Sequence, residues 1–403
     1  MNKQVLSANK QLIASAVDTR KDELRELALN IHAHPELGYQ EFKASTWLSD
    51  CLEKDGFIVE RGTAGLETAF SAVWEGKPGG PTLGILAEYD ALPGLGHACG
   101  HNLIGTSSVG AALALKDAFP ELPAKIQVLG TPAEEGLGGK VIMCEEGVFD
   151  DLDAAMMCHP KNQTMVLRGG LARVSATFKF FGKESHAASA PEKGISALDA
   201  VIQSFHAINS LRQFFTDDVR IHGVITKGGD AANIVPGYSE AQFLIRSNTR
   251  TMLEEVKEKV YAAVRQSAAS VGAKCEIDEH LVYAERNTNV SLAMLFKENL
   301  EAMGIAVHAP PAQGGIGSSD IGNVSQIVPT IHPYVKIGEA TNHTHEFTEE
   351  TKSEGGIAGM IQAAKALAMT AYDLSVQPEA LQQVKDEFKK WEEEKNDKGV
   401  VNQ

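Results

Sequence analysis

The chain has 403 residues, of which 43% are hydrophobic and 22% are charged, a composition typical of a globular protein with two or three domains. Its 53 acidic residues outnumber its 37 lysines and arginines, and the formal net charge is −16. Because a surface of that sign repels polyanions, nucleic acids and anionic membranes are poor candidate partners. Sparse cysteines, the lack of a signal-peptide pattern and the lack of an apolar run of about 20 residues predict a cytoplasmic protein without a membrane span.

The first part of the chain alternates helical and strand patterns. Amphipathic periodicity predicts helices at 21–37, 41–57 and 105–119. Short apolar runs that stop in proline, glycine or acidic residues predict strands at 81–90 and 124–136. Such alternation is typical of an α/β fold, with a mostly parallel sheet and helices on both faces.

The middle part changes to the order strand, helix, strand, strand, helix, strand, which is the ferredoxin-like βαββαβ arrangement. Because the α/β pattern resumes after it, we interpret this part as a domain inserted at a loop of the first domain. Its six elements are predicted at 171–182, 194–215, 219–229, 239–249, 251–272 and 274–283.

After the inserted domain, helices at 290–304 and 354–375 and a strand at 326–335 continue the α/β domain. The remaining segment is dense in charge and predicts a solvated helix or a frayed end. The predicted α/β domain consists of two segments, residues 1–169 and 286–375. The inserted domain lies between them at 170–285, and the charged tail follows at 376–403.

The segment GLGHACGHN, residues 94–102, brings three metal-affine side chains together among glycines. If the backbone is extended there, His97, Cys99 and His101 share one face. A thiolate with imidazoles suits Zn²⁺ and tolerates Mn²⁺ or Co²⁺. The alternative is a glycine-rich loop with structural histidines.

The segment TPAEEGLGG, residues 131–139, places Glu134 and Glu135 at the end of a predicted strand. Both can serve one centre only if the backbone turns, with one carboxylate as metal ligand and the other as base. Metal-assisted hydrolysis needs that division of roles. An exposed acidic turn is the alternative.

Two further histidine segments are weak signals alone. His159 ends the buried strand pattern AAMMC, where open α/β sheets bind ligands, and its neighbour Cys158 is expected in the core. His343 and His345 lie in a polar loop, where the alternative is an ordinary surface position. All four segments fall at strand ends or loops of the α/β domain, so together they predict a two-metal site with a base.

The inserted domain carries His186, Asn233 and Arg246. An imidazole, an amide and a guanidinium are groups that hold an oxyanion and a carboxylate. The alternatives are a capping loop, a turn asparagine and a strand arginine that faces water.

In this order, the segments AEYDALPGLGHACGHN, PAEEG, CHP, SHAASAP, NIVP…R, GGIGSSD and NHTHEF resemble the dinuclear metallo-amidohydrolase and carboxypeptidase family, which contains aminoacylase, carboxypeptidase G and succinyl-diaminopimelate desuccinylase. The HACGH and HAHPELGYQE segments resemble the cysteine-containing branch with auxin-conjugate hydrolases, aminobenzoyl-glutamate hydrolase and β-alanyl-lysine-type dipeptidases. The resemblance spans residues 30–365 and implies a zinc-peptidase-like catalytic domain with an inserted lid or dimerisation domain.

The resemblance also implies roles for individual residues. Glu134 would be the general base, His97 would lie outside the ligand set, and His345 would be the alternative to His343. Asp90 would orient the site from behind the ligands, and Glu88 stands where most relatives outside this branch have a metal-binding histidine. The implied ligands are Cys99, His101, Glu135, His159 and His343.

In the inserted domain, the resemblance assigns His186 to the neighbouring subunit's site, where it would stabilise the oxyanion. Asn233 and Arg246 would hold the substrate, with Arg246 on a carboxylate. The segment 314–320 would line the substrate pocket.

The resemblance therefore implies a metal-dependent amidohydrolase or dipeptidase that cleaves N-acyl or aminoacyl amino acids through a water activated by two metals. Its cofactors would be two Zn²⁺ or Mn²⁺ ions per subunit, with Co²⁺ as a third option. We expect a small-molecule or dipeptide substrate and a homodimer or higher homo-oligomer. The alternatives are an aminopeptidase for longer peptides and a non-catalytic metal-binding regulatory protein of the same fold.

Overall fold

The computed structural model describes residues 3–311 and 317–400, and the chain divides into two compact units. Unit 1 contains the chain up to Gly169 and from Asn287 onward, except for Gly317–Gly322. That short segment belongs with Gly170–Arg286 in unit 2. Each unit has a hydrophobic core of its own.

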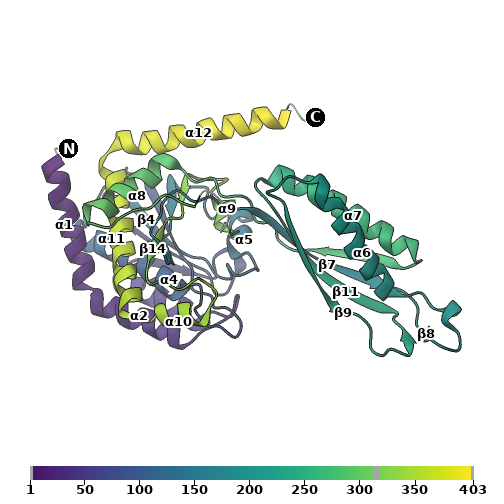
Figure 1. Ribbon diagram of the computed structural model, residues 1–403. Coiled ribbons are helices and arrows are strands. Elements are labelled where there is room, and N and C mark those ends of the chain that lie inside the picture. Colours follow the sequence, from purple (N-terminus) through teal and green to yellow (C-terminus); the bar gives the residue numbers. More distant parts are fainter. Residues whose placement is uncertain (1–2, 312–316, 401–403) are drawn as a thin grey trace. The chain divides into compact units, whose positions relative to one another are not determined.

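The sheet of unit 1 is mostly parallel, which confirms the fold class predicted from the sequence. Its strand order is β1-β2-β4-β3-β5-β13 (Figure 1). β3 pairs in parallel with β4 and β5, and β13 pairs in parallel with β5, whereas β2 is antiparallel to both β1 and β4. The strands are β1 (Ile58–Arg61), β2 (Phe70–Glu75), β3 (Thr82–Ala87), β4 (Lys125–Gly130), β5 (Ala154–Met156) and β13 (Thr330–Ile331), and a second parallel pair is β6 (His159–Lys161) with β14 (Tyr334–Lys336).

Helices pack on this sheet and on one another. α4 follows β3 in the chain, lies on β3 and β4, and packs against α11, so both helices are buried on most sides. β3 is apolar and buried on both faces, as the central strands of parallel sheets are. The helices are α1 (Lys3–Thr19), α2 (Lys21–Ala33), α3 (Phe42–Lys54), α4 (His101–Ala118), α5 (Gly139–Glu145), α8 (Val290–Ala302), α9 (Ile321–Val324), α10 (His345–Glu350), α11 (Glu354–Val376) and α12 (Pro378–Val400), with a short 3₁₀ turn at Thr63–Gly65.

Unit 2 is an antiparallel four-stranded sheet with the order β12-β7-β11-β9. The chain order is strand, helix, strand, strand, helix, strand, and α6 and α7 lie side by side along one face of the sheet (Figure 1). Alternate residues of β7 and β11 are buried, as expected for a sheet covered on one face. The elements are β7 (Ala172–Phe181), β8 (Ser185–His186), α6 (Ala197–Leu211), β9 (Arg220–Lys227), β10 (Ile234–Val235), β11 (Tyr238–Ser247), α7 (Arg250–Ser270) and β12 (Lys274–Glu279), with 3₁₀ turns at Pro191–Lys193 and Arg212–Phe214.

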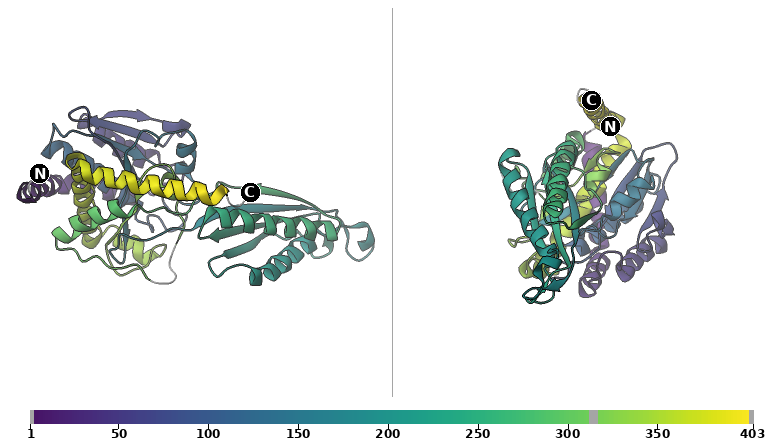
Figure 2. Two further views of the ribbon diagram at one scale, coloured as in Figure 1. Left: turned by 90° about the horizontal axis from the view of Figure 1, so that it is seen from above. Right: turned by 90° about the vertical axis from the view of Figure 1, so that its right-hand side faces the viewer.

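The charge-dense segment at the end of the chain forms α12, which runs as one straight helix (Figure 2). It is more than a solvated tail, because Val384 and Phe388 are buried. The Glu387 carboxylate accepts hydrogen bonds from the backbone N–H groups of Val290 and Ser291 at 2.5 and 2.8 Å. These are first-turn amides of α8, so α12 caps that helix.

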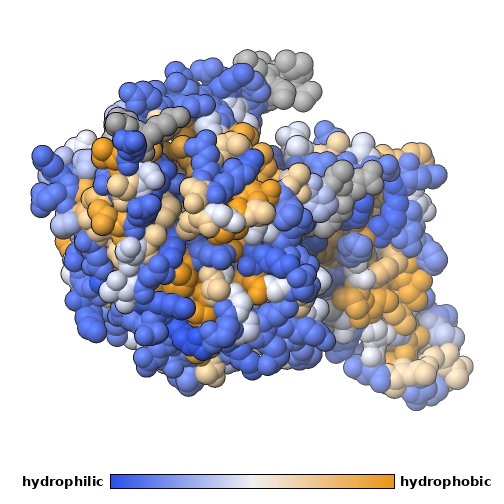
Figure 3. Space-filling view, turned by 60° about the vertical axis from the view of Figure 1, so that its left-hand side comes forward, coloured by the Kyte–Doolittle hydropathy of each residue, from blue (hydrophilic) through white to orange (hydrophobic). Residues whose placement is uncertain are grey.

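The surface agrees with the composition. On the face drawn in Figure 3, hydrophilic side chains surround separate apolar patches. Among the described residues, no helix combines the length and the hydropathy that a bilayer span requires.

The aromatic core of unit 2 supplies a stability test. Phe178 is fully buried, and its ring lies 5.4 Å from that of Phe243 and 5.7 Å from that of Tyr261. We expect Phe178→Ala to lower the free energy of unfolding of unit 2 by about 3–5 kcal/mol, because it removes buried apolar surface and leaves a cavity. Native-state hydrogen exchange of the β7 and β11 amides measures this loss.

The matched control is Phe214→Ala, since Phe214 is 74% exposed in the same unit. It should change the same free energy by less than about 0.5 kcal/mol. Equal effects of the two substitutions would contradict this description of the core.

Candidate metal centre

The segments that carry the potential metal ligands begin where neighbouring strands end. Glu88 and Asp90 follow β3, Glu134 and Glu135 follow β4, and His159 follows β5 after two residues. Because β4, β3 and β5 are adjacent and parallel, their carboxyl ends lie at one edge of the sheet. Open α/β sheets bind ligands at this edge.

The HACGH segment is a turn followed by a helix, so the extended backbone considered from the sequence is wrong. Gly100 has φ +83°, and α4 begins at His101. A Cβ atom at Gly100 would lie 2.3 Å from Cγ of Pro160, so only glycine fits. The His97 ring instead lies 3.2 Å from the carbonyl oxygen of Ile31, and burial lowers the pKa of His97 to about 3.

Six side chains of types that coordinate metals gather in unit 1, drawn from four separate segments. Among its described residues they form three overlapping groups, within each of which one potential ligand atom per residue lies within 4.8 Å of the others. The groups are Cys99, His101 and His159; Cys99, Glu135 and His343; and His101, Glu134 and Glu135. Cys99 Sγ lies 3.3 Å from Nε2 of His159. Shared members therefore join the groups into one cluster.

His343 reaches this cluster from the far end of the chain. Its backbone is left-handed, with φ +66°, and its N–H donates to the carbonyl oxygen of Ala98 at 2.8 Å. Its Nε2 lies 3.4 Å from Oε1 of Glu135. His345, the alternative, is the exposed first residue of α10 and belongs to none of the three groups.

Asp90 connects two members of the cluster. Its Oδ1 lies 2.8 Å from Nδ1 of His101, and its Oδ2 accepts the backbone N–H of Glu135 at 2.9 Å. Burial opposes its charge, but the His101 imidazole outweighs burial and lowers the pKa of Asp90. When Nδ1 of His101 donates to Asp90, Nε2 presents its lone pair to the cluster, which is how carboxylates orient metal-binding histidines.

Two observations fit the cluster to a cation. Nε2 of His101 is buried and has no hydrogen-bond partner among the described residues, so its lone pair is available to an ion. Burial, followed by the Glu135 carboxylate, raises the pKa of the Cys99 thiol well above its ordinary value. A bound divalent cation is the usual means of stabilising a thiolate in such a place.

A buried ion pair lies next to the cluster and was not singled out from the sequence. Nζ of Lys140 lies 2.6 Å from Oε1 of Glu88, and both side chains are at most 1% exposed. Oε2 of Glu88 lies 3.5 Å from Nε2 of His101. A lysine at the start of the apolar helix GKVIMCE was the available sequence signal, because buried lysines require a partner.

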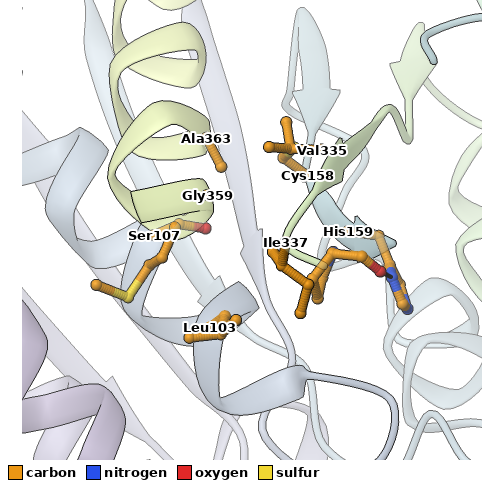
Figure 4. A pocket seen from close by; sticks show the side chains of 10 residues that line it. Leu103, Ser107, Cys158, His159, Val335, Ile337, Gly359 and Ala363 are labelled. Atoms are coloured by element: carbon orange, nitrogen blue, oxygen red, sulfur yellow. Dashed lines mark hydrogen bonds between the residues drawn. The ribbon is translucent and has the colours of Figure 1, made fainter. Parts of the chain in front are cut away.

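Behind His159 lies a small apolar pocket (Figure 4). Cys158 lines it and is 2% exposed, in agreement with its expected place in the core. The other lining residues come from α4, β6, α11 and the β14 region, and are Leu103, Ser107, Pro160, Val335, Ile337, Gly359, Met360 and Ala363. His159 therefore borders a pocket that is lined mainly by apolar groups.

The residues singled out in the inserted domain belong to unit 2, and the three groups of unit 1 do not include them. His186 is exposed on β8, and its Nδ1 accepts the N–H groups of Ala188 and Ser189, each at 3.2 Å. The hydrogen bond from Ala187 N–H to the Asn233 carbonyl oxygen, 3.0 Å long, links the two segments.

Arg246 lies half-buried on β11. Among the described residues, no hydrogen bond or ion pair involves its side chain, and its Nε is buried. Burial, and then the charge of Arg173 on the opposite strand, lowers the pKa of the Arg246 guanidinium. In the segment 314–320, residues 314–316 lie outside the described part of the chain.

The profile of Peptidase family M20/M25/M40 matches residues 84–373 of the chain. The chain belongs to this family. It is 38% identical to the Xaa-Arg dipeptidase of Mus musculus, over 94% of this chain and 92% of the relative. It is 28% identical to one of the subunits of the p-aminobenzoyl-glutamate hydrolase of Escherichia coli (strain K12), over 94% of each chain.

Solved structures share the fold of this chain. A putative aminohydrolase from methicillin-resistant Staphylococcus aureus aligns with a TM-score of 0.74 at 19% identity, over 91% of this chain and 99% of that one. A Bacillus subtilis protein described as a dinuclear metal-binding M20 peptidase aligns with a TM-score of 0.65 at 20% identity, over 88% and 99%. The family resemblance inferred from the motifs is confirmed. This M20 chain is a metal-dependent hydrolase of amide or peptide bonds.

Glu41 is a fully buried carboxyl close to the cluster that the sequence analysis did not single out. Its Oε1 accepts the N–H of Ala133 at 2.8 Å, and its Oε2 accepts the hydroxyl of Thr68 at 3.0 Å. Burial, and then the charge of Asp90, raises the pKa of Glu41 from 4.5 to about 7.

This raised pKa predicts a pH-dependent effect of Glu41→Gln on stability. Between pH 4.5 and 7 the folded protein holds a proton that the unfolded chain releases, so the wild type loses stability as pH rises, whereas the glutamine variant does not. In metal-free protein, Glu41→Gln should therefore gain up to about 3 kcal/mol relative to wild type on going from pH 5 to pH 8. Urea unfolding followed by tryptophan fluorescence measures the difference.

Tryptophan fluorescence reports on unit 1, because Trp47, Trp74 and Trp391 all belong to it. The same substitution at exposed Glu60 is the control and should show no such gain. A pH-independent difference between Glu41→Gln and wild type would contradict the prediction.

Proposed function

We propose that this M20 chain is an amidohydrolase or dipeptidase that holds two metals and cleaves the bond joining an acyl or aminoacyl group to an amino acid. The observation that carries the proposal is the overlap of the three ligand groups, with Glu134 in the third. Two of the groups would each supply three ligands, and the carboxylate that remains, that of Glu134, is the group to which we assign proton transfer.

The two triads share Cys99, whose thiolate would be a ligand in either of them. His101 and His159 complete one triad, and Glu135 and His343 complete the other. Sulfur and nitrogen ligands with one carboxylate suit Zn²⁺, with Mn²⁺ and Co²⁺ as alternatives. Divalent ions held by these residues would supply Lewis acidity at the site.

Glu134 is the general base in this proposal. Its Oε2 lies 4.0 Å from Nε2 of His101, beside both triads but in neither, and its side chain is 10% exposed. From this position it accepts a proton from the attacking water and delivers it to the leaving amine. Asp90 keeps His101 and the Glu135 backbone in place while this happens.

His186 is proposed to stabilise the oxyanion. Because its Nδ1 accepts two backbone N–H groups, its proton lies on Nε2, and the exposed imidazole presents a donor. The resemblance assigns this histidine to the neighbouring subunit's site, so the proposal includes a homodimer or higher homo-oligomer. The exposed edge strand β9, with Val224 57% and Ile225 38% exposed, supports pairing with a second copy.

Arg246 is proposed to bind the carboxylate of the substrate, with Asn233 as a second contact. The half-buried Arg246 guanidinium lacks a hydrogen-bond partner among the described residues and lies near the charge of Arg173. Such an arrangement favours the binding of an anionic group. The names of the relatives, an Xaa-Arg dipeptidase and a p-aminobenzoyl-glutamate hydrolase, both indicate substrates that end in an amino acid. We therefore assign N-acyl amino acids and dipeptides with a terminal carboxylate as the substrate class.

Substitutions at the adjacent residues Glu134 and Glu135 distinguish the proposed base from a proposed metal ligand. Glu134→Gln should keep both metals but lose about 10²–10⁴ in kcat, because proton transfer is removed. Glu135→Ala should lose one of the two ions, because a ligand is removed. Metal analysis together with hydrolysis of N-acyl amino acids, dipeptides and aminobenzoyl-glutamate in Zn²⁺ or Mn²⁺ tests both variants against wild type.

Wild-type inactivity across this panel with metal bound would contradict the proposal and favour a non-catalytic protein. Activity confined to longer peptides would favour an aminopeptidase.

Recognition of the substrate carboxylate is tested at Arg246. Arg246→Met should raise KM about 10- to 100-fold for a substrate with a terminal carboxylate, since it removes a charged hydrogen-bond donor. The same variant should change KM little for the corresponding terminal amide. Arg220→Met is the control, because Arg220 is exposed and lies opposite Arg246 on β9. Equal losses with the carboxylate and the amide would refute the assignment.

A further inference from the structure

The turn between β4 and α5 that carries Glu134 and Glu135 depends on a strained residue. Ala133 has φ +60°, a conformation that residues with a Cβ adopt only when their surroundings impose it. Within the turn, the Gly136 N–H donates to the carbonyl oxygen of Glu134 at 2.7 Å, and the Gly138 N–H donates to that of Ala133 at 2.9 Å. The left-handed Ala133 changes the direction of the chain directly before Glu134 and Glu135. Such a turn is needed if both carboxylates are to face the same centre.

Two carboxylates from other segments hold the backbone of this turn. Asp90 accepts the Glu135 N–H at 2.9 Å, and Glu41 accepts the Ala133 N–H at 2.8 Å. Asp90 also binds His101, so its contact with the turn belongs to the metal cluster. Glu41 belongs to none of the ligand groups, and the proposed proton transfers do not use it.

The N-terminus of α3 is arranged so that the Glu41 side chain can reach the turn. Glu41 precedes the first residue of α3, but its side chain does not cap that helix. Glu36 does so instead, since its Oε2 accepts the N–H groups of Lys43 and Ala44 at 2.9 and 3.1 Å. An ordinary capping role for Glu41 is thereby excluded.

The same segment contacts the turn at two more points. The Tyr39 hydroxyl donates to the carbonyl oxygen of Leu137 at 3.0 Å, and Tyr39 is itself left-handed with φ +62°. A Cβ atom at Gly38 would lie 3.0 Å from Cβ of Ala133, so the backbones are in close approach. The segment 38–41 thus lies along the turn, with Glu41 binding the residue before the base.

Placing this carboxylate in the interior opposes stability. Glu41 is 0% exposed, and its two oxygens accept hydrogen bonds from Ala133 and Thr68, which are uncharged. A buried carboxyl without a cation costs free energy, whereas an apolar residue of similar size does not. An apolar residue at position 41 would have no oxygen to accept the hydrogen bond from the Ala133 N–H, and this is what the Glu41 carboxyl provides.

We propose that Glu41 is a positioning residue for hydrolysis, whose acceptor oxygen holds Ala133 left-handed and so directs Glu134 toward the reacting water while Glu135 faces the ligand cluster. This inference rests on the proposed role of Glu134 and extends it to the segment that fixes its backbone. Because the bond needs only an acceptor, a neutral amide oxygen at position 41 does the same work.

The test compares two substitutions of similar volume that differ in this acceptor. Glu41→Gln keeps an oxygen for the Ala133 N–H and should hold kcat within about 3-fold of wild type. Glu41→Met fills the space without an acceptor and should lower kcat about 10- to 100-fold, the scale of a roughly 1 Å misplacement of a catalytic group. KM and the metal content should stay near wild type in both, because Arg246 is untouched and Asp90 still holds Glu135.

The control is Glu36→Gln, which changes the carboxylate that caps α3 but touches no residue of the turn. It should leave kcat unchanged. A purely structural role for Glu41 would lower the yield of folded protein without separating the Gln and Met variants in kcat per folded enzyme. Full kcat in Glu41→Met, or an equal loss in Glu41→Gln and Glu41→Met, overturns the inference.

A second measurement does not require that Glu41→Met folds. The Ala133 amide should exchange slowly with solvent in wild type and in Glu41→Gln, and rapid exchange in wild type would also overturn the inference. The proposed function fails separately, if Glu134→Gln keeps its turnover. Loss of turnover in Glu134→Gln together with full kcat in Glu41→Met rejects only the role of Glu41.

Discussion

The arrangement of the candidate metal ligands depends on the hydrogen bonds of the Asp90 carboxylate. One oxygen binds His101 at the start of α4, and the other binds the backbone of Glu135 after β4. Asp90 itself follows β3, the neighbour of β4 in the sheet. A single buried side chain thus connects two segments that each supply potential ligands. The parallel pairing of β3 with β4 brings Asp90 close to Glu135, because each residue follows one of these strands.

The fold class and the gathering of the cluster could be anticipated, because both follow from regular patterns. Apolar runs such as 81–90 and 124–136 stop at acidic residues, and parallel strands bring those stops to one edge of the sheet. In the middle of the chain, alternation and helical periodicity give the order of β7 to β12. The roles of individual site residues stay predictions, since they came from the resemblance.

The backbone of the site could not be anticipated. Ala133 and His343 have positive φ values, although neither is glycine, and their N–H groups donate to residues distant in the sequence, the Glu41 carboxylate and the Ala98 carbonyl oxygen. The extended backbone considered for HACGH was wrong for a related reason. α4 begins at His101, and Gly100 adopts a left-handed conformation in close contact with Pro160. No local pattern contains these tertiary constraints. The pairing of Lys140 with Glu88 also joins residues that the sequence separates.

The order of the two units along the chain has a consequence for synthesis on the ribosome. Unit 2 is formed almost wholly by the continuous stretch Gly170–Arg286, so its sheet can assemble as soon as that stretch emerges. Unit 1 must wait, because β13 completes the sheet and α8 receives its cap from Glu387. The first segment, with Cys99 and His101 already translated, therefore lacks β13 and the cap of α8 until the chain has been synthesised as far as Glu387.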